Sequence, residues 1–332
     1  MLIKIKELKE LVKRVLLTEY SEEEALLIED VLMYGELSGR SSHGLLRLIR
    51  GNYGVFVDKT RFTPHFDRKT KVSTLIRGNN NPGMLIGPLA MQEGIKLAKR
   101  NSIGIVGTMG SFNSIGPLSY YCEKIGKENL IGIIMASAAP QIAPFNLKQP
   151  FFGTNPIAFV IPADPLPVIF DMSTSSMTFG DIVKYKIEVR RLKPHAALDK
   201  NGEETTDPEE ALKGATLAFD AFYKGSGLAM MVEILAAVWS GGGFASLHEE
   251  KGWGNLFMMM SPELLSDVKT LKSRTHELIT HLKNSSTRDG KPVRIPGERS
   301  LQTKEENLRR GEIEVNEEIV IELRDSLKQK NK

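Results

Sequence analysis

The chain has 332 residues, of which 41% are hydrophobic and 26% charged, a composition typical of a soluble globular protein with a substantial buried core. Its net charge of +3 is small and no long basic block is present, which argues against a nucleic-acid partner. The single cysteine, Cys122, excludes an internal disulfide and leads us to expect a reducing, cytoplasmic location.

Two helices are predicted near the N-terminus. The opening segment places lysines between aliphatic residues at helical spacing, so it predicts an amphipathic helix and neither a signal peptide nor a membrane span. Ser21 followed by Glu24 is a capping-box pattern that predicts a second helix over roughly residues 22–38. That helix leads into SSHGLLRL. This run is either a capped helix end or a site in which His43 and Arg47 share one helical face.

Short apolar strands and glycine-rich turns are predicted for the middle of the chain. A loop-rich stretch follows GNYG, and NPGMLIGPLAMQEGIKLAKR then predicts a helix. Four runs are typical of buried strands, namely SIGIVGT, LIGIIMAS, PIAFVIPA and PVIFDMS, and the helix-like PLSYYCEKIGKE lies between the first two. A charged, weakly periodic region covers roughly residues 183–213.

The last third returns to helices. KGSGLAMMVEILAAVW predicts a buried helix, NLFMMMS a strand, and residues 261–283 an amphipathic helix, and the turn RIPGERS precedes a polar helical C-terminus. Because helices gather at both ends, we predict an α/β fold with a helical lobe built from the termini. We place this lobe at residues 1–70 and 300–332, and the α/β domain that binds cofactor and substrate at residues 71–299.

Several motifs resemble known binding sites. GIVGTMGSFNSIG lacks the G-x-G-x-x-G spacing, and the next strand ends without an acidic residue for a ribose, so a Rossmann site is disfavoured. The histidines show no ligand spacing, so no metal site is predicted. The hydroxyl-rich DMSTSSMTFG could donate to a phosphate or ribose, or could cap a helix. Lys224 precedes a Gly-Ser-Gly helix start, which favours a bound anion there, a phosphate or a carboxylate.

The order of five motifs along the chain carries more information than any one of them. SSHGLLRL, FFGTNPIAF, VIFDMSTSS, YKGSGLAMMVEIL and RIPGE together resemble the type-2 malate/L-lactate dehydrogenase family over roughly residues 5–325. These are non-Rossmann 2-oxoacid reductases that use NAD or NADP and include ureidoglycolate and sulfolactate dehydrogenases. The resemblance implies a mostly antiparallel central sheet flanked by helices, and a homodimer with its active site near the interface.

The resemblance also implies roles for individual residues. His43 matches the proton donor to the 2-oxoacid, and Arg47 matches the ligand of its carboxylate. Ser114 stands where a second active-site histidine is usual, and we include it among the candidate catalytic residues. The implied cofactor-binding residues are Thr154, Asn155, Asp171, Met172, Ser173, Thr174, Ser175, Ser176, Met177, Tyr223, Lys224, Gly297 and Glu298.

Two functions remain open from the sequence. The first is hydride transfer between NAD(P)H and a small 2-oxoacid related to malate, lactate or ureidoglycolate, with no nucleic-acid or membrane partner. Histidine can exchange a proton near neutral pH, and arginine can bind a carboxylate through two parallel hydrogen bonds. The second, suggested by Ser114, is a degenerate family member that binds a nucleotide or metabolite without turnover.

Overall fold

A computed structural model of the chain describes residues 1–49, 54–57, 60–245 and 251–330. Its centre is a seven-stranded sheet with the order β2-β3-β4-β12-β5-β7-β8. The strands are β2 (His65–Thr70), β3 (Ser73–Arg77), β4 (Ile103–Ser111), β12 (Trp253–Met260), β5 (Ile131–Ala136), β7 (Ile157–Ile161) and β8 (Val168–Met172). Only β3 and β4 pair in parallel, and every other neighbouring pair in this sheet is antiparallel. The predicted mixed fold with a mostly antiparallel sheet is confirmed.

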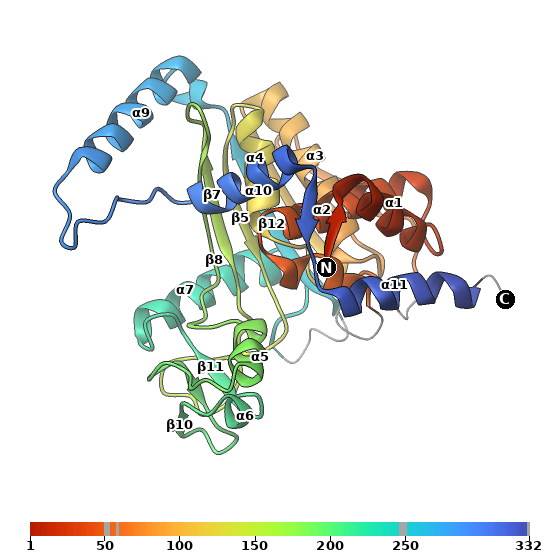
Figure 1. Cartoon of the computed structure of the whole chain (residues 1–332). Helices are drawn as coiled ribbons and strands as arrows, with labels where there is room; N and C mark the ends of the chain where they lie inside the picture. The colour runs from red at the N-terminus through yellow and green to blue at the C-terminus, as the bar shows by residue number, and fades with distance from the viewer. Residues whose placement is uncertain (50–53, 58–59, 246–250, 331–332) are drawn as a thin grey trace.

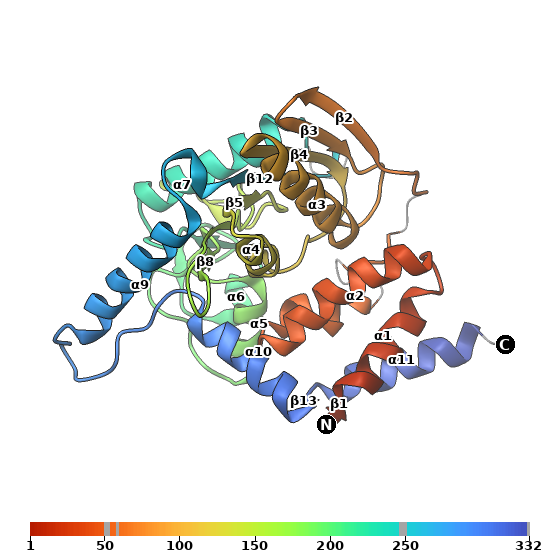
Figure 2. The ribbon, with the colours of Figure 1, turned by 90° about the horizontal axis from the view of Figure 1, so that it is seen from above.

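Helices cover both faces of this sheet (Figure 2). Successive residues of β4 point to opposite faces of the sheet. Val106 packs against Gly94 of α3 (Gly83–Asn101) on one face, and Gly107 packs against Ser240, just after η3 (Ile234–Val238), on the other. The helix α4 (Leu118–Lys127) packs against β5, β7 and β8, while α7 (Tyr223–Glu233) runs directly into η3. The central strands are therefore buried on both sides, which explains their short apolar sequences.

The two ends of the chain lie side by side (Figure 2). The strand β1 (Leu2–Lys4) pairs with β13 (Glu312–Glu314), α1 (Ile5–Leu16) packs on α11 (Glu317–Lys330), and α2 (Glu22–Leu37) packs on α10 (Glu298–Arg310). The predicted capping box at the start of α2 is present. One hydrophobic core runs from these helices into the sheet. The division of the chain at residues 70 and 300 stays a prediction.

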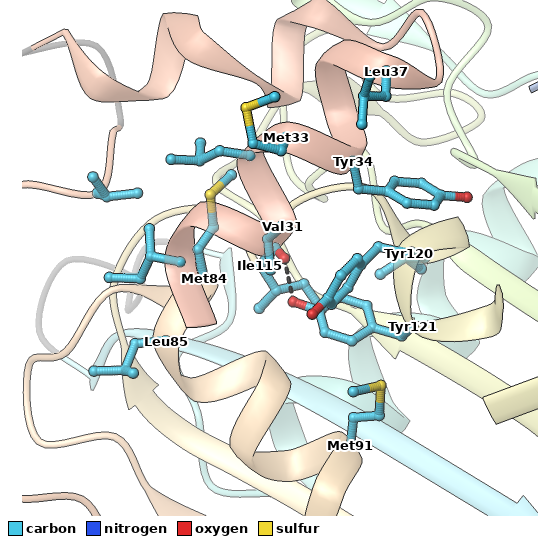
Figure 3. Close-up of a cluster of buried hydrophobic side chains, with 14 of the residues drawn as sticks. Val31, Met33, Tyr34, Leu37, Met84, Leu85, Met91, Ile115, Tyr120 and Tyr121 are labelled. Carbon is cyan, nitrogen blue, oxygen red and sulfur yellow. Dashed lines mark hydrogen bonds between the residues drawn. The ribbon is translucent and has the colours of Figure 1, made fainter. Parts of the chain in front are cut away.

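Tyrosines join the terminal helices to the sheet layer (Figure 3). Tyr34 of α2 meets Tyr120 of α4 edge-on at 5.6 Å between ring centroids, and Tyr120 meets Tyr121 at 4.9 Å. The Tyr121 hydroxyl donates to the carbonyl of Ile115 and lies against Gly87, where a side chain would collide with the ring. This packing fixes α2 relative to α4, and therefore fixes the end of α2 where the motif SSHGLLRL begins.

Three features differ from the sequence prediction. The hairpin β2–β3 occupies part of the stretch predicted as loop, because β2 is a charged, mostly exposed edge strand without an apolar pattern. A small sheet of β6 (Ile142–Ala143), β9 (Ala197–Leu198), β10 (Glu204–Thr205) and β11 (Ala215–Leu217) organises the charged region, beside α5 (Phe179–Ile187) and α6 (Pro208–Ala211).

The third difference concerns the predicted amphipathic helix, which is α9 (Val268–Asn284). It projects from the body of the protein and buries none of its residues in this chain (Figure 1). Within the described part of the chain, no helix is both long and apolar enough to cross a membrane.

Candidate active site

The segment carrying His43 and Arg47 forms two tight turns instead of continuing α2. The short 3₁₀ helices η1 (Ser41–His43) and η2 (Leu45–Leu48) are separated by Gly44. The His43 amide donates to the Arg40 carbonyl at 2.9 Å, and the Arg47 amide donates to the Gly44 carbonyl at 2.9 Å. The Arg47 side chain then folds back, with Nε donating to the Ser42 carbonyl at 2.8 Å. The turns therefore bring the guanidinium group of Arg47 to the segment that carries His43.

The surroundings of His43 disfavour its protonated form. Its Nδ1 lies 3.1 Å from the Ser42 hydroxyl, and the side chain is half-buried. Burial, and next the positive charges of Arg47 and Arg40, lower the pKa of His43 to about 3. His43 is neutral around pH 7 in the protein without substrate.

Arg40 connects this segment to the strand β8. Its guanidinium Nη1 lies 3.1 Å from Oδ2 of Asp171, whose side chain is only 7% exposed. The same oxygen accepts the Ser119 amide at 3.0 Å, at the first turn of α4, where a negative charge is favourable. The Asp171 carboxylate thus has two donors within the chain. The ion pair places the His43 segment beside the start of the predicted cofactor segment, residues 171–177.

That segment runs between the GTNP turn and the strand β11. The Thr174 amide donates to the Thr154 carbonyl at 2.8 Å, the Ser176 amide donates to the Leu217 carbonyl at 2.8 Å, and Ser175 forms a bridge with Ala218. The Ser173 and Ser175 hydroxyls lie 2.7 Å apart. Met172 is the last residue of β8, and Met177 belongs to a small hydrophobic cluster with Ile182 of α5.

Asn155 ties the GTNP turn to α7. It is fully buried with a positive φ of 37°, and its Nδ2 donates to the Ala229 carbonyl at 3.0 Å and to Oε2 of Glu233 at 2.6 Å. Asparagine tolerates this left-handed conformation better than most residues. The side chain of Asn155 is thus used inside the protein. The hydrogen bonds use Nδ2, and the buried Oδ1 has no partner among the described residues.

The start of α7 corrects one inference made from the sequence. Tyr223 and Lys224 are exposed there, as a contact with a ligand would require. However, Asp220 Oδ1 accepts the amides of Phe222 and Gly225, each at 3.0 Å. The anion predicted at this helix start is therefore supplied by the chain itself. The position of Lys224 no longer argues for a bound phosphate or carboxylate, although the side chain remains accessible to one.

Gly297 and Glu298 lie against the first half of β8. The Ile169 amide donates to the Pro296 carbonyl at 3.2 Å, and Gly297 has a φ of 87° and packs so closely on Ile169 that a side chain would collide. Glu298 accepts the Ile295 amide at 3.1 Å and pairs with Lys283, whose hydrogen bond lowers the pKa of the Glu298 carboxyl. This carboxylate therefore has partners within the chain.

Ser114 lies in the loop between β4 and α4, close to the chain after Arg47. Its hydroxyl accepts the Gly116 amide at 3.0 Å. The preceding Asn113 donates to the Gly54 carbonyl at 2.6 Å, and the Val55 amide donates to the Arg47 carbonyl at 2.8 Å. The Asn113 side chain therefore ties the loop to the residues that bond to the Arg47 carbonyl. The described residues contain no group of three or more His, Cys, Asp or Glu side chains that could hold a metal ion.

Comparison with known proteins identifies the group to which this arrangement belongs. The family described as malate/L-lactate dehydrogenase matches residues 3–324. The chain belongs to this family. It is 33% identical over 316 residues to the malate/(S)-sulfolactate dehydrogenase of Methanothermus fervidus, which covers 92% of the chain and 91% of that relative. The family assignment made from the motifs is confirmed, and the protein is a dehydrogenase.

Solved structures agree with the fold. A malate dehydrogenase from Entamoeba histolytica superposes with a TM-score of 0.89 at 26% identity, covering 98% of this chain and 96% of that one. The sulfolactate dehydrogenase from Methanocaldococcus jannaschii gives a TM-score of 0.84 at 30% identity, covering 98% and 97%. The predicted non-Rossmann sheet is therefore shared along almost the whole length of these dehydrogenases.

Sequence reasoning missed three charged residues around the site. Arg40 pairs with Asp171, Glu233 holds Asn155, and Glu36 of α2 accepts the Leu45 amide at 2.7 Å. The only sequence signal was an acidic residue within an apolar helical run, in MVEIL for Glu233 and in MYGEL for Glu36. An acidic residue is buried far less often than the apolar residues around it, so the pattern alone does not predict that these two glutamates are buried.

Proposed function

We propose that the protein transfers a hydride between NAD or NADP and C2 of a small 2-oxoacid or 2-hydroxyacid, with His43 as proton donor and Arg47 as carboxylate ligand. The observation that carries this proposal is the return of the Arg47 side chain to the Ser42 carbonyl, which brings a cation to the residue before His43. A 2-oxoacid has a carbonyl next to a carboxylate, so its two groups match this pair of side chains.

Arg47 would orient the substrate. Its guanidinium group can form two parallel hydrogen bonds with a carboxylate, which fixes both the position and the plane of that group. Burial lowers the pKa of Arg47, but arginine remains protonated in proteins, so the charge is retained. A bound carboxylate would also offset the cost of holding this cation away from water.

His43 would exchange a proton with the substrate oxygen. In the direction of oxidation, the neutral imidazole can accept the hydroxyl proton as soon as the hydroxyacid binds. In the direction of reduction it must first be protonated. A carboxylate bound to Arg47 cancels one of the charges that lower the pKa of His43, so substrate binding makes protonation easier. Because the Ser42 hydroxyl lies at Nδ1, Nε2 would be the ring nitrogen that exchanges a proton with the substrate.

The exposed groups near residues 171–177 fit a dinucleotide in their chemistry. The partly exposed Ser173 hydroxyl can serve a ribose or phosphate, Lys224 can pair with a phosphate, and the half-exposed Tyr223 ring can stack on a base. The Thr174 carbonyl accepts the Phe219 amide at 3.0 Å, which places the segment close to the start of α7. When bound, the nicotinamide supplies or accepts the hydride.

A homodimer is also proposed. The outer face of α7 and η3 exposes large apolar side chains, namely Met230, Met231, Ile234, Val238 and Trp239. Large apolar side chains exposed together on one helix often mark a contact with another protein. A second copy bound along α7 would lie beside the start of the helix that carries Tyr223 and Lys224, and so beside the cofactor region.

The test is a spectrophotometric screen of NADH and NADPH oxidation over a panel of 2-oxoacids. We expect turnover with at least one of them and a loss of about 10²-fold or more in kcat for His43→Ala, the usual scale for removing a general acid. His281→Ala serves as the control, since this histidine is on α9 with a side chain 78% exposed. Binding of cofactor without any turnover would favour the binding-only alternative, and near-normal turnover of His43→Ala would remove the assignment of His43.

A further inference from the structure

A buried carboxylate contacts the turn that carries His43 and Arg47 and has no role in the chemistry described above. Glu36 is only 7% exposed and belongs to the last turn of α2. Within the described part of the chain it forms no ion pair, and it sits at the helix end where a negative charge is least favourable. Burying an unpaired acid in such a place is costly, so its contacts should explain why it is there.

The carboxylate holds the centre of the His43–Arg47 segment. Its Oε1 accepts the Leu45 amide at 2.7 Å. Leu45 is the first residue of η2 and lies between His43 and Arg47 in the chain. An amide at the start of a helix has no partner within that helix, so Glu36 supplies the bond that the turn itself cannot. The bond connects the end of α2 to the link between the two side chains.

Two glycines allow this close approach. A Cβ atom at Gly44 would lie 2.2 Å from Glu36 Oε1, and one at Gly35 would lie 2.7 Å from the His43 carbonyl oxygen. Real Cβ atoms essentially never come so close to other atoms. The end of α2 and the turn are therefore in direct contact at Gly35 and at Gly44. A longer or differently shaped side chain at position 36 would therefore have to displace the turn.

We propose that Glu36 is a positioning residue for the reaction, and that its bond to the Leu45 amide fixes the relative placement of His43 and Arg47. The inference rests on the proposed function, because the two side chains must address one substrate at the same time. A displacement of about 1 Å in such an arrangement can cost about 10²-fold in rate. Glu36 touches neither the substrate nor the cofactor in this proposal and acts only through the turn.

A second glutamate on the same helix provides a matched control. Glu29 is 9% exposed, and burial raises the pKa of its carboxyl, as it does for Glu36. Its charged neighbours include Lys9 and Lys13 of α1, and it lies about two helical turns before Glu36 in α2. Replacing Glu29 therefore removes a buried acid from α2 without touching the Leu45 amide.

The experiment compares Glu36→Gln, Glu36→Met and Glu29→Met in the full-length protein. Glutamine keeps both the size and a hydrogen-bond acceptor, whereas methionine keeps the size alone. We expect Glu36→Met to lower kcat/KM for the 2-oxoacid by about 10-fold to 100-fold, and Glu36→Gln to recover most of that loss. In a His43→Ala background, Glu36→Met should cause little further loss, because both changes act on the same step.

A measurement that needs no activity separates this proposal from the proposed function. The ring resonances of His43, assigned in NMR spectra by their loss in His43→Ala, should shift in Glu36→Met and stay in place in Glu29→Met. Unchanged His43 resonances in Glu36→Met, or equal activity of Glu36→Met and Glu36→Gln, would overturn the positioning role. Shifted resonances in a protein that reduces no 2-oxoacid would support the control of the turn by Glu36 and count against the proposed reaction.

Discussion

Changing the pH should affect the two directions of the reaction very differently, because His43 is neutral in the protein without substrate. Burial together with Arg47 and Arg40 lowers its pKa from 6.5 to about 3. At pH of about 7 only on the order of 10⁻⁴ of the molecules then carry a protonated His43. The value of kcat/KM reports the ionisation of the free enzyme, so it is the quantity to measure.

In the reaction that we propose, the reactive form of His43 for oxidation of the hydroxyacid is the neutral one. We expect kcat/KM for oxidation to be constant between about pH 5 and 8, since His43 is already neutral throughout this range. For reduction the reactive form is the protonated one, so kcat/KM should fall about tenfold for each unit of rising pH across the same range. An unperturbed histidine would instead give a bend near pH 6.5 in both profiles.

The assay records the reduction of NAD or NADP with the best hydroxyacid, and the reverse reaction with its oxoacid, over a pH series at constant ionic strength. Salt must be held constant because the charges of both arginines are partly screened by it. The reasoning is refuted if kcat/KM for oxidation falls tenfold for each unit by which the pH drops below about 6.5 and is constant above that pH. Such a profile would mean that the two arginines do not act on His43, or that another group is the base.

Three further predictions follow from named contacts. Arg47→Lys keeps the charge but loses the planar fork, so steady-state kinetics should show KM for the oxoacid raised about tenfold or more; an unchanged KM would contradict its role. Burial raises the pKa of Glu36 from 4.5 to about 7, so the free energy of unfolding of the wild type should fall as the pH rises through that range. In urea unfolding, the stability of Glu36→Gln relative to the wild type should therefore increase by about 3 kcal/mol between pH of about 4.5 and 8. A difference that does not change with pH would disprove the shift. Lys304→Met leaves Glu123 paired only with the exposed Lys127 and should cost about 2 kcal/mol, the scale of one hydrogen bond to a charged group. Adding Glu123→Gln should restore most of this loss, whereas additive losses would show that the pair is not coupled.

Local patterns in the sequence were sufficient for most elements of the sheet and of the helical layers. The capping box at Ser21, the apolar run of β12 and the helix beginning at Gly83 all encode their structure in neighbouring residues. The hairpin β2–β3 was missed because β2 is held by pairing with β3 and not by an apolar pattern of its own. The periodicity of α9 correctly predicted a helix but could not show that its apolar side chains lie uncovered in this chain.

The candidate site divides in the same way. The residue types and the order of the motifs were enough to select His43 and Arg47 and to identify the family. The cofactor contacts stay a prediction, and the structure brings residues 171–177 to the GTNP turn and close to the start of α7. It also replaces one inference, because Asp220 supplies the anion that had been expected from a ligand beside Lys224.

The sequence by itself determined most of the elements and the family, and it singled out the two side chains that we propose for the chemistry. Only the tertiary structure decided their surroundings, because the partners come from distant parts of the chain. Arg40 meets Asp171 across the interface between α2 and the sheet, and Glu36 reaches Leu45 only because α2 stops and the chain turns back over it. Charge and burial depend on what lies nearby in space, so the pKa of His43 follows from packing that no local pattern encodes.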